Sequence, residues 1–165
     1  MSWVFDERFD RKLHEFACDF WGDEVESPIE FMFLTAFHLA NDHHPAGLQW
    51  EITPQSDMHC GGGIVHRVDF ELLAAGRPEV QVIVECDGRD FHHANWEQLQ
   101  RDRERDRQIE KAHKCKVFRF PGTQLFNDPI SCAEAVISYA VEYQVAAYRR
   151  RRARREQRAK RDDAA

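Results

Sequence analysis

Three acidic residues stand on two consecutive predicted strands, at spacings that bring them toward one site. Asp69 lies in the alternating segment Ile64 to Leu73, and Glu85 and Asp87 stand at the end of the apolar segment Glu79 to Cys86. Residues of one parity share a face of a strand, so Glu85 and Asp87 point the same way, about 7 Å apart. If the two strands pair as a hairpin, Asp69 lies close to Glu85.

The chemistry that such carboxylates support is metal-assisted hydrolysis. Neighbouring carboxylates raise each other's pKa unless a cation lies between them. Mg²⁺ and Mn²⁺ are hard ions that suit carboxylates, water and substrate phosphate as ligands. A bound ion polarises a phosphoryl oxygen and helps to deprotonate an attacking water. The alternative is that the acids only decorate a solvated face. For Glu85 the run Val80 to Val84 opposes that alternative, because it is too apolar for an exposed strand.

Periodicity places these residues in a single α/β domain. The strand-like segments are short and end at Pro or Gly turns: Leu48 to Thr53, Ile64 to Leu73, Glu79 to Cys86 and Lys114 to Phe120. Apolar spacing and capping residues predict helices over residues 1–20, from Ser27 to about Asn41, from Asn95 to His113, and from Asp128 into the C-terminal tail. This order predicts a mixed four-stranded sheet flanked by helices, with extra N- and C-terminal helices.

Composition excludes several classes of protein. Hydrophobic residues make up 42 % of the chain, and no apolar run approaches the length of a membrane span, so neither a disordered nor a membrane protein is expected. The N-terminal segment is charged throughout and lacks the pattern of a signal peptide. The five cysteines are odd in number and form no CxxC pair, which favours a reduced, cytoplasmic protein over a disulfide scaffold.

Positive charge is concentrated at the C-terminus. Residues 149–165 contain nine Lys/Arg and three acidic residues, a net charge of +6, and since the whole chain carries −6, the rest carries −12. A basic segment of this kind binds polyanions, and a solvated helix end is the alternative. The chain is therefore divided into a domain over residues 1–148 and a basic helical tail over residues 149–165. The tail residues predicted to contact nucleic acid are Arg149, Arg150, Arg151, Arg152, Arg154 and Arg155.

Several short motifs together resemble the PD-(D/E)xK nuclease superfamily, and in particular the small bacterial domains related to very-short-patch repair endonucleases. The resemblance spans about Ser27 to Phe120 and rests on the order and spacing of the motifs. The motifs are Glu30 in an early helix, Asp69 in its strand, Glu85-Cys86-Asp87-Gly88 followed by His92, the helical segment Arg101-Asp102-Arg103-Glu104-Arg105-Asp106, and Val117-Phe118-Arg119-Phe120.

The resemblance implies a restriction-endonuclease-like αβββαβ core and assigns roles to matching residues. It implies that Asp69, Glu85 and the backbone carbonyl of Cys86 hold Mg²⁺ or Mn²⁺, with Glu30 as an outer ligand. Ser27 and Glu30 also match a capping box, so a structural role for Glu30 stays open. The superfamily has Lys where this chain has Asp87, which makes Asp87 a candidate base or additional ligand.

Further residues are predicted to supply positive charge and proton transfer. Arg101 and Arg105 are expected to contact phosphate, with Arg105 also in the catalytic site. His92 follows a strand end and is a candidate proton donor, phosphate contact or metal ligand, with a surface histidine as the alternative. Asp102 or Asp106 is expected to pair with an arginine near the site, because acids on the inner stripe of a helix need partners.

These residues together predict an endonuclease that hydrolyses DNA with Mg²⁺ or Mn²⁺ and an activated water, without a covalent enzyme intermediate. One alternative is a decayed nuclease fold that acts as a nucleic-acid-binding or interaction module, because Asp87 replaces the Lys. Another is that residues 128–160 form a docking helix for a partner. The protein partners that stay open are a second copy of the chain and a helicase- or methyltransferase-type protein.

Overall fold

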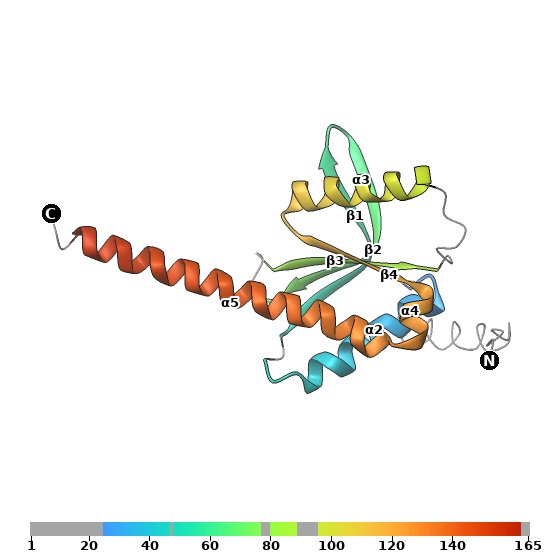
Figure 1. Cartoon of the computed structure of the whole chain (residues 1–165), viewed down its shortest axis with the longest axis horizontal. Coiled ribbons are helices and arrows are strands. Elements are labelled where there is room, and N and C mark those ends of the chain that lie inside the picture. Colours follow the sequence, from blue (N-terminus) through green and yellow to red (C-terminus); the bar gives the residue numbers. More distant parts are fainter. Residues whose placement is uncertain (1–24, 47, 77–79, 89–95, 163–165) are drawn as a thin grey trace.

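The computed structural model describes residues 25–46, 48–76, 80–88 and 96–162 (Figure 1). The helix predicted over residues 1–20 and His92 lie outside the described residues. The elements follow one another as α2 (Pro28–His43), β1 (Trp50–Gly61), β2 (Ile64–Ala74), β3 (Gln81–Asp87), α3 (Trp96–His113), β4 (Lys116–Pro121), α4 (Gly122–Asn127) and α5 (Pro129–Asp162).

A four-stranded sheet in the order β1-β2-β3-β4 forms the centre of the fold. β1, β2 and β3 pair antiparallel, and β4 pairs parallel with β3 after the crossover through α3. Antiparallel neighbours need only a turn between them, whereas a parallel neighbour requires such a crossover. The order α2-β1-β2-β3-α3-β4 confirms the predicted α/β fold with a mixed sheet flanked by helices.

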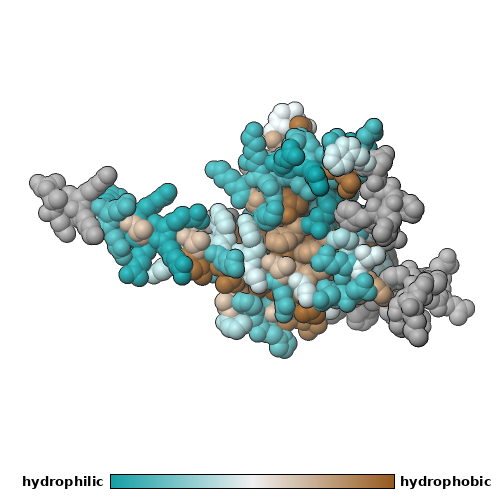
Figure 2. All heavy atoms as spheres, in the orientation of Figure 1, coloured by the Kyte–Doolittle hydropathy of each residue, from teal (hydrophilic) through white to brown (hydrophobic). Residues whose placement is uncertain are grey.

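Helices cover both faces of the sheet (Figure 1). α2 and α5 pack together on one face and share the larger hydrophobic core, in which Phe33, Phe37 and Phe70 are fully buried. α3 lies on the other face, over a smaller core that includes Ile83 and Ile109. Figure 2 shows apolar residues gathered where α5 meets the body, whereas the projecting part of α5 is hydrophilic. The two cores hold the sheet rigidly between the helices that carry the predicted site residues.

β1 is longer than predicted. The strand was expected to end at Thr53, before Pro54, but it continues to Gly61. Among the strands that the structure describes, β1 pairs with β2 alone and is therefore an edge strand. A proline lacks the backbone N–H, which an edge strand tolerates because no second neighbour requires it. The predicted end of the strand at Thr53 was wrong for this reason.

The β1–β2 ribbon changes its packing face part-way along its length. Phe70 belongs to the core beneath α2 and α5, whereas Val68 and Met58 belong to the core beneath α3. Between these two regions Gln55 and Asp69 are not paired across the β1–β2 ladder. Gln55 has a left-handed φ of 49°. Side chains of one parity keep to one face only while a strand is regular. Asp69 therefore lies at an irregular point of β2.

Within the described ranges, no helix is both long enough and apolar enough to cross a membrane. The four cysteines that the structure describes are free thiols: Cys60, Cys86, Cys115 and Cys132.

Candidate active site

The candidate site lies where β2 and β3 separate. The ladder between the two strands ends at the pair Phe70 and Val84. Beyond it a side chain continues the pairing, because the backbone N–H of Cys86 donates to Asp69 Oδ2 at 2.6 Å. The carboxylate of Asp69 is thereby fixed against the backbone of β3, immediately beside Glu85.

Glu85 is the second acid of the site and is only 6 % exposed. Arg105 Nη2 from α3 lies 2.7 Å from Glu85 Oε1, and Arg119 Nη2 from β4 lies 4.0 Å from the same oxygen. The close contact with Arg105 is an ion pair without hydrogen-bond alignment, so Oε1 has no hydrogen-bond donor among the described residues. Buried polar atoms are almost always satisfied, and a water or a cation is one partner that such an oxygen could take.

α3 and β4 bring positive charge to these acids. Arg119 stands opposite Glu85 in the parallel register of β3 and β4, and its Nη2 donates to Asp106 Oδ1 at 3.0 Å. Arg105 also donates to the backbone carbonyl of Arg67, which ties α3 to β2. The expected pairing of Asp102 or Asp106 with an arginine near the site is confirmed for Asp106.

Burial raises the pKa of both acids. The pKa of Asp69 rises from 3.8 to about 6 because the group is buried, although the Cys86 hydrogen bond opposes the rise. The pKa of Glu85 rises from 4.5 to about 7, again chiefly through burial; Arg105 opposes this rise and the charge of Asp69 adds to it. Loss of hydration therefore outweighs the favourable partners. Raised pKa values at neighbouring carboxyls are typical of functional sites and are not expected of acids on a solvated face.

Glu30 joins the site from the first turn of α2 and is 5 % exposed. Its Oε1 accepts from the Ser27 hydroxyl at 2.7 Å, and its Oε2 accepts from the backbone N–H of Glu26 at 3.0 Å. The backbone N–H of Glu30 also donates to Ser27 Oγ at 3.3 Å, which confirms Ser27 as the N-cap, whereas the Glu30 side chain reaches the N–H of Glu26 rather than that of Ser27. Its charge also raises the pKa of Asp69, so Glu30 lies within electrostatic range of the other two acids. The role of Glu30 as a metal ligand stays a prediction.

Gln55 is a member of the site that sequence reasoning missed. Its Nε2 donates to Glu30 Oε2 at 3.0 Å, and its Oε1 accepts from Arg67 Nε at 3.0 Å. Arg67 in turn pairs with Glu26 at 2.6 Å. This chain of contacts braces the Glu30 carboxylate against the β1–β2 ribbon. A glutamine after a proline carries no sequence signal of such a contact.

The remaining predicted site residues differ in how the structure places them. Asp87 ends β3 opposite Pro121 and is half-buried, with the parity that keeps it on the face of Glu85. Arg101 is exposed on α3. His92 lies outside the residues that the structure describes. The predicted nucleic-acid-binding arginines of the tail are exposed on the part of α5 that projects from the body (Figure 1).

Asp69 and Glu85 fit a hard divalent cation that takes most of its ligands from outside the protein. Mg²⁺ binds in this way, through one or two carboxylates together with water and phosphate. The two carboxyls are electrostatically coupled, and Glu85 Oε1 has no aligned donor in the described structure. Within that structure, no group of three or more His, Cys, Asp or Glu side chains is arranged to hold a metal ion. A two-carboxylate site also requires Arg105 to leave Glu85.

Comparison with known proteins finds no match to a protein-family model, a curated protein or a solved structure.

Proposed function

We propose that this chain is a metal-dependent endonuclease of the PD-(D/E)xK type, which hydrolyses phosphodiester bonds in DNA. The observation that carries the proposal is the pair of half-buried Asp69 and buried Glu85, with pKa values raised to about 6 and about 7, at the point where β2 and β3 separate. Two such carboxyls are costly to bury without a cation, and a cation beside them is what phosphodiester hydrolysis uses. The order of the sequence motifs supports the same function.

Five groups of the site would each have a task in this reaction. Asp69, Glu85 and the backbone carbonyl of Cys86 would hold Mg²⁺ or Mn²⁺. When bound, the ion would polarise the scissile phosphoryl group and lower the pKa of a water. Asp87 is the candidate base that takes the proton from the water that attacks phosphorus. Arg105 would stabilise the negative charge that grows on the phosphoryl oxygens.

The direct test is incubation of supercoiled plasmid and linear DNA with Mg²⁺, Mn²⁺ or EDTA. Nicked or linear product is expected with either metal and none with EDTA. Absence of cleavage of DNA and RNA under every metal, while nucleic-acid binding persists, would overturn the catalytic proposal.

Arg105 should compete with the metal for Glu85, because its Nη2 lies 2.7 Å from Oε1. We therefore expect Arg105→Met to bind Mn²⁺ more tightly than the unmodified chain does. The same change should slow cleavage by about 10²-fold, because the guanidinium no longer stabilises the phosphoryl charge. Isothermal titration with Mn²⁺ and the initial rate of plasmid nicking measure the two effects.

Arg107→Met is the matched control for this change. Arg107 lies on the same helix, is largely exposed and pairs with Glu104 at 3.3 Å. Arg107→Met should leave both the affinity for Mn²⁺ and the rate of cleavage unchanged. Weaker Mn²⁺ binding in Arg105→Met, or cleavage equal to that of the control, would contradict the role assigned to Arg105.

A second candidate function is a nucleic-acid-binding module on a nuclease fold that has lost activity. The ion pair between Arg105 and Glu85 favours it, because the arginine already neutralises an acid that must bind the metal. Asp87 in place of Lys favours it as well. The retained carboxyl of Asp69 beside Glu85 opposes it. A module of this kind would bind DNA equally well in EDTA and would take up no Mn²⁺ at this site.

The projecting part of α5 is the proposed DNA contact outside the active site. The side chains of residues 149–158 are exposed, and this stretch is rich in arginine. Lys and Arg neutralise phosphates and release counterions, so a contact of this kind weakens steeply as salt concentration rises.

A further inference from the structure

One face of α5 stays exposed both beside the body and along the projecting tail. A helix turns by about 100° per residue, so residues three, four and seven apart lie on the same side. On α5 the exposed residues within about 60° of the line through Glu142 are mostly small or aliphatic. They are Ser131, Ala135, Ser138, Glu142, Val145, Ala146, Arg149, Ala153, Glu156 and Gln157.

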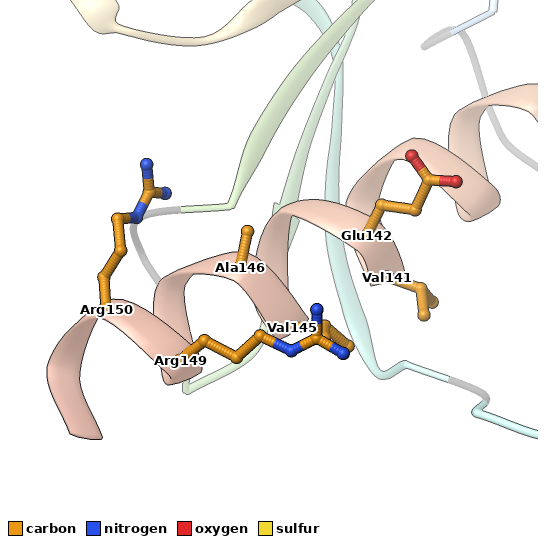
Figure 3. A pocket seen from close by; sticks show the side chains of 6 residues that line it. All are labelled: Val141, Glu142, Val145, Ala146, Arg149 and Arg150. Atoms are coloured by element: carbon orange, nitrogen blue, oxygen red, sulfur yellow. The ribbon is translucent and has the colours of Figure 1, made fainter. Parts of the chain in front are cut away.

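A shallow groove on this face is lined by three successive turns of α5 (Figure 3). Glu142 stands near one end of the groove, Arg149 stands near the other, and Val145 and Ala146 lie between them. Val145 is 43 % exposed. Within the described part of the chain, neither Glu142 nor Arg149 forms an ion pair. The groove therefore offers an unpaired acid, an apolar centre and an unpaired base in sequence.

The groove is complementary to a reversed copy of itself. A two-fold axis that crosses α5 between Val145 and Ala146 would place Glu142 opposite Arg149 of a second copy, and Arg149 opposite its Glu142. The same register places Ser138 opposite Ala153 of the second copy, and small residues allow the two helices to approach closely. A parallel pairing would instead bring two arginine-rich tails together, and like charges repel. Charge thus selects the antiparallel arrangement.

We propose that α5 pairs antiparallel with α5 of a second copy of this chain, in the isologous manner of a two-fold dimer. In this register residues 135–156 of the two copies overlap over about 33 Å. Each tail of residues 149–165, with its net charge of +6, then runs beside the remainder of the other copy, which carries −12. Electrostatic complementarity of this kind fixes both the partner and the register.

The pairing also accounts for a helix that continues beyond the body. An isolated helix of the length that projects is marginal in water, and like charges four residues apart weaken it further. Arg150 and Arg154 are one such pair, and Arg151 and Arg155 are another. A partner helix that supplies acidic and apolar contacts offsets this repulsion.

Apart from Arg149, which the dimer would take from the proposed DNA contact, the two interactions use different sides of α5. Helical spacing places Arg151, Arg154, Arg155 and Arg158 on the side opposite Glu142 and Arg149. Pairing of the groove therefore does not cover these four arginines, which lie on the side of α5 proposed for DNA. The dimer therefore goes beyond the proposed nuclease activity and does not depend on it.

The test is the mass of the full chain in solution, measured by sedimentation velocity over a hundredfold range of concentration after removal of bound nucleic acid. The unmodified chain should sediment as a concentration-dependent dimer. Glu142→Arg and Arg149→Glu should each raise the dissociation constant at least about tenfold, because each places like charges opposite one another. The double variant with both changes restores opposite charges across the axis and should recover the dimer.

Arg154→Glu is the matched control, because it makes the same charge change on the opposite side of α5. It should keep the dimer and weaken DNA binding. A monomer at every concentration would overturn the proposal, and so would equal weakening by Arg149→Glu and Arg154→Glu or a double variant that stays monomeric. Circular dichroism of each variant shows whether the helix is retained. Plasmid cleavage is measured separately, so failure of the dimer and failure of the nuclease are distinguishable.

Discussion

Asp69→Asn is expected to abolish DNA cleavage and leave the fold intact. Asparagine has the same shape as aspartate, and its side-chain oxygen retains the acceptor for the Cys86 N–H, now 2.6 Å from Oδ2. The junction of β2 and β3 is therefore preserved. The change removes the charge of one of the two carboxylates that are proposed to hold the metal, and loss of one such electrostatic group costs about 10³-fold in rate. The initial rate of plasmid nicking at saturating Mg²⁺ measures the effect.

Asp57→Asn is the control for the loss of an acid from the same β1–β2 ribbon. Asp57 is exposed on β1, opposite Arg67. It should leave cleavage unchanged. Equal cleavage by the two variants would rule out Asp69 as a metal ligand. Asp69→Asn should still bind DNA, because the proposed phosphate contacts lie on α3 and α5.

The proximity of Asp69 and Glu85 is predictable from the sequence because strand periodicity in the two segments places them at neighbouring positions, and the irregularity of the β1–β2 ribbon at Asp69 does not move it away from the backbone beside Glu85. Parity assigns each residue to a face, and the short connection before Val80 makes a hairpin the simplest pairing. The burial of Glu85 follows from the apolar residues that precede it, and Val82, Ile83 and Val84 are indeed fully buried. Local pattern therefore suffices where backbone geometry is repetitive.

Other members of the site depend on tertiary contacts that no local pattern encodes. Arg119 reaches Asp106 because α3 crosses over between β3 and β4, and the register of that crossover sets which arginine faces Glu85. Gln55 reaches Glu30 from an edge strand that continues past a proline. Gln55 itself has a left-handed backbone conformation. The sequence predicts that Asp106 needs a positive partner, since a half-buried acid does. It does not predict which one.

Glu85→Gln is expected to stabilise the fold at pH 8, in EDTA, by on the order of 3 kcal/mol, several degrees in Tm. The pKa of Glu85 is about 7 in the folded chain, above its ordinary value of 4.5. Between pH 4.5 and pH 7 the folded state therefore retains a proton that the unfolded chain releases. The stability that depends on this proton is fully present below pH 4.5 and is lost as the pH rises through 7. Glutamine stays uncharged at every pH and does not undergo this loss.

Glu110→Gln should give the opposite result and serves as the control. Hydrogen bonds from Lys116, at 2.7 Å, and from the backbone of Val117 lower the pKa of Glu110 despite the opposing effect of burial. Its ionised form stabilises the fold above its ordinary pKa, so this variant should be less stable than the unmodified chain at pH 8. Thermal unfolding between pH 4 and 8 measures both variants. If Glu85→Gln is no more stable than the unmodified chain at pH 8, this result would contradict the raised pKa of Glu85.

Mg²⁺ connects this stability to the proposed function. An ion held by Asp69 and Glu85 favours their ionised forms, so Mg²⁺ should raise the Tm of the unmodified chain at pH 8, where burial of the two charges is most costly. Glu85→Gln should gain little from Mg²⁺, because glutamine carries no charge for the ion. The residue that weakens the metal-free fold at pH 8 would then be the one that the bound metal requires. An equal rise in Tm for both proteins would place the Mg²⁺ elsewhere.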